Sequence, residues 1–391
     1  MSRTRAEWVL PASMLIGTFA WSFVYVSLPF HIQRMSTLDP AATLRWTGWI
    51  LGVSPLITVI TAPISGRLGE RVDPRRGFIA VQAFQGLGFL GMAAARTLPE
   101  MLLARMLLGL MGAVSTFAFI MVGRSGGDVR RQVSSIQSGM TLGQVLGPAV
   151  GAVVAARLGI RLSFLLGAGM LWACSALVSW GVPPGKAGDA SATRERRISL
   201  RELITVSLVV LTGSTQVFFL TSILPQILPP LGVPVESTLE VGGFLIFITG
   251  LAASLGAMAA PRLAELLGDH RTVLWFLLGS SLLLASLAAA GSVWTFGVLR
   301  FLQVLCIAPV FPLSVAAIAQ RASGGAIGFV NSARIGAAFL GPVLATTLLS
   351  SMPPAVVYLA LAGLGIAAVP LVARMDRRSR LRDEPGGGVA G

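Results

Sequence analysis

The chain has 391 residues, of which 54% are hydrophobic and only 12% are charged, and its mean hydropathy is +0.79. Soluble domains carry about 25% charged residues, so most of this surface faces something other than water. The net charge of +14 would indicate nucleic-acid binding in a soluble protein, but the arginines lie in short segments between apolar runs, where they orient a membrane protein instead. No nucleic-acid partner is therefore expected.

Apolar runs of bilayer-spanning length recur along the whole chain. The first follows Arg3 and Arg5, but it is too long for a signal peptide and many more runs follow, so we expect a retained first helix. Counting runs of about 20 residues predicts an all-α membrane protein with twelve transmembrane helices, at residues 8–31, 46–65, 78–96, 99–122, 133–156, 162–182, 202–229, 239–260, 272–291, 294–319, 325–350 and 354–374.

A polar stretch, residues 183–201, separates the sixth predicted helix from the seventh and has the composition of a solvated linker. It divides the prediction into an N-terminal six-helix bundle, residues 1–182, and a C-terminal six-helix bundle, residues 202–374. The linker is expected to be cytoplasmic. The tail, residues 375–391, is basic and then glycine-rich, and it is expected to be disordered on the cytoplasmic side.

Lys and Arg gather in alternate interhelical segments. Clusters at 67–76, 124–131, 186–201 and 374–382 would share one side of the membrane with the N-terminus. The other side would hold Arg34, Arg45, Arg96, Arg157 and Arg161. Because positively charged segments stay inside, both termini of this multi-pass protein are predicted to be cytoplasmic. The near-exclusive use of arginine over lysine suggests a GC-rich bacterial genome, and hence the bacterial inner membrane.

The two halves share sequence at a nearly constant offset. Arg105-Met106-Leu107-Leu108 corresponds to Arg300-Phe301-Leu302-Gln303, 195 positions later, and Leu28-Pro29 corresponds to Leu224-Pro225. The two bundles are therefore expected to be duplicated and related by a pseudo-two-fold repeat. Transporters built from such parallel repeats hold their substrate near the membrane midplane.

The segment between the second and third predicted helices, residues 66–76, interleaves arginines with carboxylates. It is similar to the signature of the loop between helices 2 and 3 in the major facilitator superfamily, and departs from it at Asp73 and Pro74. The resemblance implies a latch on the cytoplasmic side, with Glu70 facing the start of helix 11, where a carboxylate gains about 0.3–1 kcal/mol from the helix dipole. The alternative is that these arginines only orient the chain. The implied gating residues are Gly66, Glu70, Arg71, Asp73, Arg75 and Arg76.

Two further motifs resemble the same superfamily. In the fourth predicted helix Arg105 is followed by glycine at four and seven residues, all on one helical face. In the fifth, glycine recurs every four residues, a smooth stripe for tight helix packing. The stripe resembles the antiporter motif of drug and metabolite exporters and comprises Gly139, Gly143, Gly147, Pro148 and Gly151. The chain is thus identified as a member of the major facilitator superfamily that resembles its twelve-helix drug and metabolite antiporter branch, and the resemblance implies the major facilitator fold.

All sixteen acidic residues lie in loops or at helix ends, whereas Arg105, Arg300 and Arg334 lie inside predicted helices without a carboxylate at that depth. An unpaired arginine in the membrane favours an anion, and its planar fork of donors suits a carboxylate. We therefore hypothesise an anionic or zwitterionic substrate. Two alternatives stay open: Arg105 could extend to the lipid headgroups, and Arg300 and Arg334 could bond to carbonyls and neighbouring amides and serve gating.

Other side chains could complete the site, because the resemblance implies that helices 1, 4, 7 and 10 line the cavity. Amides both donate and accept hydrogen bonds, and aromatic rings can flank an organic substrate or simply pack. Prolines in helices 1, 7 and 10 give these helices places to bend. The predicted substrate contacts are Arg300, Arg334, Arg105, Gln216, Gln303, Asn331, Trp21, Tyr25 and Gln144.

The sequence contains no catalytic constellation, nucleotide-binding loop or metal-ligand spacing, so neither an enzyme nor a resident metal or cofactor is expected. We expect a monomeric secondary active transporter, surrounded by lipid, that moves a small molecule by alternating access. The glycine stripe favours efflux by antiport, coupled to a proton or a counter-anion. The arginines and the missing acids favour the alternative, an importer or exchanger of an anionic nutrient or siderophore-like chelate.

Overall fold

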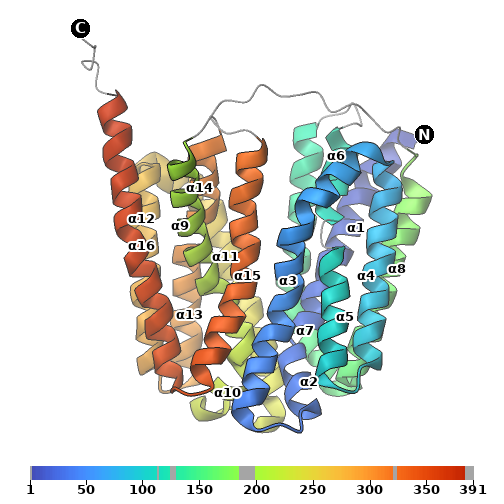
Figure 1. Cartoon of the computed structure of the whole chain (residues 1–391), viewed down its shortest axis with the longest axis horizontal. Coiled ribbons are helices and arrows are strands. Elements are labelled where there is room, and N and C mark those ends of the chain that lie inside the picture. The colour runs from blue at the N-terminus through green and yellow to red at the C-terminus, as the bar shows by residue number, and fades with distance from the viewer. Residues whose placement is uncertain (1, 112–113, 124–128, 185–198, 320–323, 384–391) are drawn as a thin grey trace. The chain divides into compact units, whose positions relative to one another are not determined.

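The structure, a computed structural model, describes residues 2–111, 114–123, 129–184, 199–319 and 324–383, and the side chains of 7–61, 72–111, 114–122, 131–184, 199–316 and 328–373. All regular structure in these residues is helical (Figure 1). Twelve candidate membrane spans follow one another along the described chain, from Glu7–Met35 to Pro354–Ala373. The prediction of an all-α protein with twelve transmembrane helices is confirmed.

Eight of the spans are each built around one uninterrupted α-helix. Proline stands at the first position of three of these helices, where its missing amide costs no hydrogen bond. The eight helices are α3 (Pro40–Arg71), α4 (Pro74–Ala94), α7 (Val129–Leu158), α8 (Ile160–Gly181), α11 (Thr238–Leu267), α12 (Asp269–Ser286), α15 (Gly324–Leu349) and α16 (Pro354–Asp383). Single 3₁₀ turns flank some of them: η2 (Pro229–Leu231), η3 (Val235–Ser237) and η4 (Leu287–Ala289).

The other four spans, the first, fourth, seventh and tenth, are interrupted. Their parts are α1 (Ser2–Tyr25) and α2 (Leu28–Met35), α5 (Leu98–Leu110) and α6 (Val114–Gly123), α9 (Leu200–Phe218), η1 (Leu220–Ile223) and α10 (Leu224–Ile227), and α13 (Val293–Ile307) and α14 (Val310–Ala319). Pro29, Pro225 and Pro309 lie at three of these interruptions, in the helices where the sequence placed bends. The interruption in the fourth span was not predicted.

The chain forms two compact units that do not coincide with its two halves. Unit 1 comprises Met1–Ala192, Thr221–Gly250 and Pro342–Ser351, and unit 2 comprises Thr193–Leu220, Leu251–Gly341 and Met352–Gly391. The seventh, eighth and eleventh spans therefore each pass from one unit to the other. The division at residues 182 and 202 into two six-helix bundles stays a prediction.

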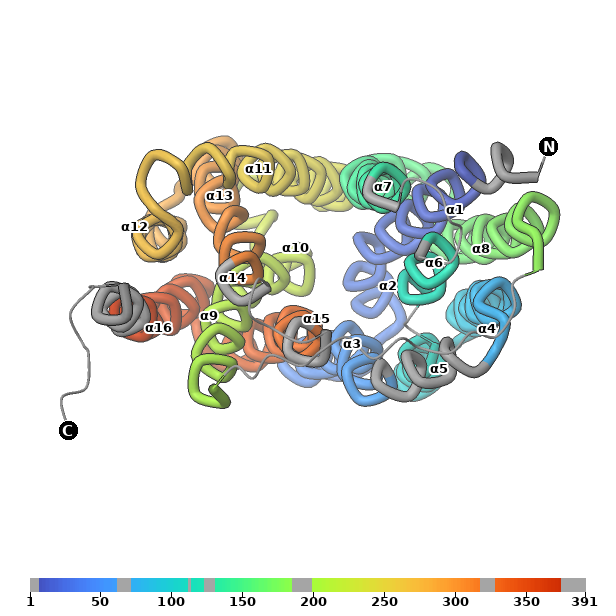
Figure 2. Tube along the Cα trace, turned by 90° about the horizontal axis from the view of Figure 1, so that it is seen from above, coloured from blue at the N-terminus to red at the C-terminus, as the bar shows by residue number. Residues whose placement is uncertain are grey.

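Within unit 1, α1 packs along α7 and α4 packs along α8 (Figure 2). A core of apolar side chains fills the space among α1, α4, α6, α7 and α8, and includes Met14, Phe78, Phe117, Ile136 and Val178. Within unit 2, α12 packs against α16 and α13, and α9 packs against α16. Its main core includes Val209, Leu277, Ile307, Val310 and Ala368.

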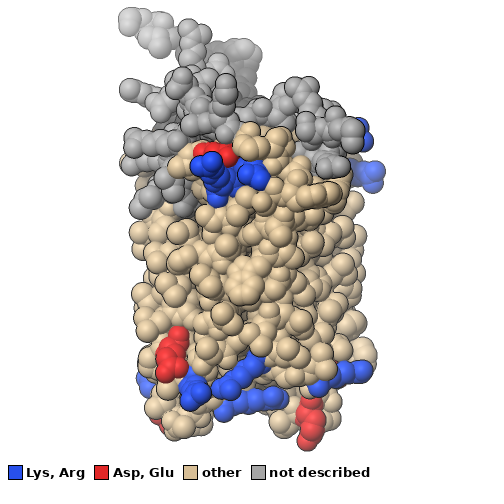
Figure 3. All heavy atoms as spheres, turned by 90° about the vertical axis from the view of Figure 1, so that its right-hand side faces the viewer, with Lys and Arg blue, Asp and Glu red and all other residues tan. Residues whose placement is uncertain are grey.

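The charged residues avoid the middle of the visible surface. On the face shown in Figure 3 the described Lys, Arg, Asp and Glu side chains gather toward two opposite ends, with a broad uncharged band between them. Many large apolar side chains are exposed when the protein is considered without lipid, including Trp49, Leu103, Trp180 and Trp275. Exposed apolar surface on this scale is expected where lipid covers the protein.

Candidate functional site

Arg105 in α5 is 2% exposed and directs its guanidinium at α3. Its Nη2 donates to the carbonyl oxygen of Leu51 at 2.9 Å, and its Nε donates to that of Ile50 at 3.1 Å. The Leu51 carbonyl needs an outside donor, because the residue four positions later is Pro55, which has no amide proton. Arg105 thus completes the hydrogen bonding of a proline-containing helix, and it does not extend to the lipid headgroups.

Two aromatic rings of α1 surround the same guanidinium. The Cζ atom of Arg105 lies 5.7 Å from the ring centroid of Trp21 and 5.7 Å from that of Tyr25, both within cation–π range. Trp21 also donates from Nε1 to Oε1 of Gln85 at 3.1 Å, and Gln85 donates from Nε2 to the carbonyl of Met111 at 2.7 Å, where α5 ends. The structure therefore brings together Trp21, Tyr25 and Arg105, three of the residues that were predicted to contact the substrate.

Arg300 in α13 is fully buried and is directed at the end of α9. Its Nη1 donates to the carbonyl of Gln216 at 2.7 Å and its Nη2 to that of Val217 at 2.8 Å, while Cζ lies 5.1 Å from the ring centroid of Phe219. Arg105 and Arg300 therefore each direct two of their three guanidinium nitrogens at helix carbonyls. For these two arginines the geometry favours bonding to helix carbonyls over the predicted substrate contact.

The side chains of Gln216 and Gln303 belong to the same buried cluster. Nη1 of Arg300 donates to Oε1 of Gln303, and Nε2 of Gln303 donates to Oγ of Ser280 at 2.8 Å. Ser280 donates to Oε1 of Gln216 at 2.7 Å, and Nε2 of Gln216 donates to Oγ of Ser281 at 2.9 Å. Each of these five side chains is buried, so the predicted contacts Gln216 and Gln303 satisfy one another.

Arg334 in α15 differs from the other two arginines. It is partly buried, and its Cζ lies over the ring of Phe311 in α14, 4.7 Å from the centroid. No hydrogen bond or ion pair joins its guanidinium to any part of the chain that the structure describes. Its N–H donors are therefore available. The remaining predicted contacts, Asn331 and Gln144, have exposed side chains when the protein is considered without lipid.

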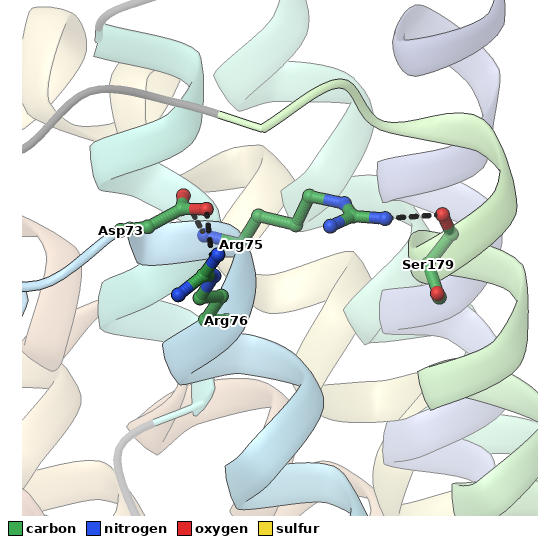
Figure 4. A network of polar contacts seen from close by, with 4 residues as sticks. All are labelled: Asp73, Arg75, Arg76 and Ser179. Carbon is green, nitrogen blue, oxygen red and sulfur yellow. Dashed lines mark hydrogen bonds and ion pairs between the residues drawn. The ribbon is translucent and has the colours of Figure 1, made fainter.

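The loop residues that the structure describes stabilise two helix ends (Figure 4). Asp73 is the N-cap of α4 and accepts from the amide of Arg75 at 3.0 Å, and its Oδ2 lies 3.9 Å from Nε of Arg76. The guanidinium of Arg75 donates to the carbonyl of Ser179, near the end of α8. The side chains of Gly66, Glu70 and Arg71, the rest of the predicted latch, lie outside the described residues.

The glycine stripe of α7 faces the backbone of α1. A Cβ at Gly139 would lie 2.6 Å from the carbonyl oxygen of Pro11, and one at Gly147 would lie 2.8 Å from that of Phe19. Gly143 and Gly151 meet the backbone of α1 in the same way. Four glycines at four-residue spacing therefore admit four successive turns of the neighbouring helix, as the sequence predicted for a packing stripe.

Comparison with known proteins decides the family. A sequence profile of the Major Facilitator Superfamily matches residues 12–242 and 211–389, which together cover nearly the whole chain. The chain belongs to the major facilitator superfamily. It is therefore a membrane transporter and not an enzyme, and its fold is the major facilitator fold.

The chain is similar to several bacterial transporters at low identity. It is 24% identical to the MFS-type transporter YuxJ of Bacillus subtilis over 81% of this chain and 83% of that protein. It is 24% identical to the multidrug resistance protein MdtG of Serratia proteamaculans over 72% of this chain and 71% of that one.

Solved structures of superfamily transporters share the fold. The nucleoside transporter NupG has a TM-score of 0.77 at 11% identity, covering 95% of this chain and 99% of its own. The human organic anion transporter MFSD10 has a TM-score of 0.68 at 16% identity, covering 95% and 100%. At identities this low, the similarity to these structures supports a shared fold and nothing further.

Four residues that bond or explain the buried polar groups were not predicted from the sequence. They are Gln85, Ser280, Ser281 and Pro55. The repeat offset held a usable signal. Trp21 and Gln216 are 195 positions apart, as are Gln85 and Ser280, and Arg105 and Arg300. The hydrogen bond from Trp21 to Gln85 thus corresponds to the one between Gln216 and Ser280. Described residues contain no group of three His, Cys, Asp or Glu placed to hold a metal ion.

Proposed function

We propose that this transporter exports a small organic molecule with an anionic or zwitterionic group, by alternating access and in exchange for a proton or a counter-anion. The observation that carries the substrate class is the state of Arg334. It is the one of the three predicted arginine contacts whose donors are not used by carbonyls or amides in the described chain.

A guanidinium in this position would gain from an anionic partner. Arg334 lies ten residues into α15, roughly 15 Å along the helix at 1.5 Å per residue. Burying a cation away from water without hydrogen bonds is costly, and the Phe311 ring covers one face while leaving the N–H edges unused. A carboxylate or phosphate group could accept two of those N–H bonds at once. Asn331, three residues earlier on α15, could add an amide contact.

The distribution of acids supports the same substrate class. No acidic residue lies in the middle of a candidate span, and no described carboxylate pairs with Arg105, Arg300 or Arg334. Proton-coupled exporters of organic cations usually rely on a carboxylate within the membrane to bind the cation, and this sequence has none there. The coupling proton, if one is used, would have to be carried by an end-of-helix group or by the substrate itself.

The proposed direction of transport rests on two other observations. The relatives named MdtG are multidrug resistance proteins, which suggests export of organic molecules. The glycine stripe packed on α1 resembles the antiporter motif. The alternative function is an importer or exchanger of an anionic nutrient or chelate, and the absence of a membrane-embedded carboxylate favours it. We further propose that the protein works as a monomer in the bacterial inner membrane, with both termini in the cytoplasm and residues 66–76 as its cytoplasmic latch.

A flux assay in inverted membrane vesicles tests the substrate class and the direction. The probes are p-aminohippurate (an anion), uridine (neutral) and tetraphenylphosphonium (a cation). We expect accumulation of p-aminohippurate that depends on the transporter, and its collapse with an uncoupler would identify the proton as the exchanged ion. Accumulation of tetraphenylphosphonium alone would contradict the anionic substrate class. Exchange of p-aminohippurate without any gradient would favour the exchanger over the antiporter.

A binding assay tests the role of Arg334. Arg334→Gln removes the charge and should weaken binding of p-aminohippurate at least tenfold, as expected for loss of a charge-assisted bidentate pair. Arg334→Lys keeps the charge without the fork and should weaken it less. Arg96→Gln, which removes an exposed arginine at the end of a span, is the matched control and should change nothing. Unchanged affinity in Arg334→Gln would exclude this site.

A further inference from the structure

We infer that Arg300 is a positioning residue: it fixes the end of α9, where the seventh span is interrupted and where the chain passes from unit 2 to unit 1. This assignment separates Arg300 from the proposed substrate contact at Arg334. It rests on where its donors point, on what holds its guanidinium in place, and on where the chain changes unit.

The end of α9 has more carbonyls than the amide of Phe219, which donates to Thr215, can satisfy. The last four carbonyls of an α-helix have no intrahelical amide, and α9 ends at Phe218 inside a membrane span. The guanidinium of Arg300 donates to two of these carbonyls, Gln216 and Val217, and covers the Phe219 ring at the first position after the helix. A cation also suits the negative end of the helix dipole. One side chain thus satisfies two of the carbonyls that the interruption leaves without an intrahelical amide.

The guanidinium itself is held from the other side. Gln303, one turn later on α13, accepts from Nη1, and its amide is bonded in turn to Ser280 of α12. Ser280 donates to the side chain of Gln216, the same residue whose carbonyl Arg300 contacts. The ring of bonds closes through the three helices α9, α12 and α13. Rotating Arg300 away would leave several buried polar groups unpaired.

Two glycines allow this close assembly. A Cβ at Gly365 of α16 would meet the side chains of Gln216 and Ser281, and a Cβ at Gly341 of α15 would lie 3.0 Å from the amide nitrogen of Phe219. Gly341 is also the last residue of α15 in unit 2, and Leu220 is the last residue of the seventh span in unit 2. Two of the chain's crossings into unit 1 therefore begin beside the helix end that Arg300 holds.

The pseudo-equivalent residue in the other half does a different task. Arg105 donates to carbonyls in the middle of the uninterrupted helix α3, and the α5 end near Met111 is served by the neutral amide of Gln85. Only the C-terminal copy of the arginine caps an interrupted span within the described residues. The repeat alone would have assigned both arginines the same role.

Hydrogen–deuterium exchange of the purified full-length protein in detergent tests the inference, without any substrate. Arg300→Gln should speed amide exchange in residues 216–224 by about tenfold, because a charge-assisted hydrogen bond to a buried carbonyl contributes on that scale. Arg300→Lys, which can reach one carbonyl but not bridge both, should speed it by a smaller factor. Exchange in α7, which belongs to unit 1, should not change in either variant.

Arg334→Gln is the matched control, because Arg334 lies in the same unit and makes no hydrogen bond in the described chain. It should leave exchange in 216–224 as in the wild type. If Arg300→Gln yields no monodisperse protein, Arg300→Lys decides alone. Unchanged exchange in 216–224, or a rise spread evenly over helices of both units, would overturn the assignment.

Discussion

The guanidinium of Arg105 donates a 2.9 Å hydrogen bond to the carbonyl of Leu51, the acceptor that Pro55 leaves without an amide. Two features of the sequence that look unrelated, a proline in the second span and an arginine in the fourth, thus compensate each other in the fold. Proline in a helix interior removes one hydrogen bond, and inside a membrane no water replaces it. An arginine at this depth is then required by its neighbour and needs no substrate to explain it.

This pairing predicts a coupling between the two residues. Arg105→Gln should lower the free energy of unfolding in detergent by about 1–3 kcal/mol, because it leaves buried carbonyls unpaired. In a Pro55→Ala background residue 55 can donate to Leu51 itself, so the same change should cost at least about 1 kcal/mol less. Pro148→Ala, in another helix of unit 1, is the control background. Equal costs in all three backgrounds would show that Arg105 does not compensate for Pro55.

The glycine stripe makes a second prediction about stability. Gly147→Ala places a methyl group 2.8 Å from the carbonyl oxygen of Phe19, in backbone that cannot move aside without separating α7 from α1. We expect a loss of about 1–3 kcal/mol and a lower yield of folded protein. Gly169→Ala in α8 meets nothing within 4 Å and should be neutral or slightly stabilising. Thermal unfolding followed by size-exclusion chromatography compares the two; equal stability would mean that the helices tolerate separation.

How far the sequence predicts this protein depends on whether a property is local. Hydropathy located all twelve spans, because span length is set by the bilayer. Spacing alone identified the stripe at Gly139–Gly151, since a four-residue repeat lies on one helical face. The bends near Pro29, Pro225 and Pro309 also followed from single residues.

The roles of the arginines were not predictable in the same way. Arg105, Arg300 and Arg334 look alike in sequence, each alone inside an apolar run. They differ in which carbonyls face them, and that depends on the packing of helices distant along the chain. The sequence argument that an unpaired arginine favours an anion holds only where no helix end or proline supplies the acceptor. By that criterion Arg334 is the one of these three arginines that remains a candidate for binding an anion.

The buried amide cluster of unit 2 makes a third prediction. Gly365→Ala in α16 places a methyl group against the side chains of Gln216 and Ser281, whereas Gly363→Ala, half a turn earlier, meets nothing within 4 Å. The first variant should lose about 1–3 kcal/mol of stability and should also loosen the hydrogen bonds of Gln216. The second should behave as wild type. A Gly365→Ala protein as stable as Gly363→Ala would show that the cluster adapts to an added methyl group.

The fourth prediction concerns the start of α4, where the loop departs from the superfamily pattern. Asp73 stands where the pattern has glycine, and its carboxylate caps the helix by accepting from the amide of Arg75. Asp73→Ala should cost about 0.5–2 kcal/mol, whereas Asp73→Asn, which retains an oxygen acceptor, should cost a few tenths or less. If Asp73 serves only as a cap, transport of p-aminohippurate by Asp73→Asn should match the wild type. Loss of transport in Asp73→Asn, with stability retained, would instead place the negative charge of Asp73 in the latch.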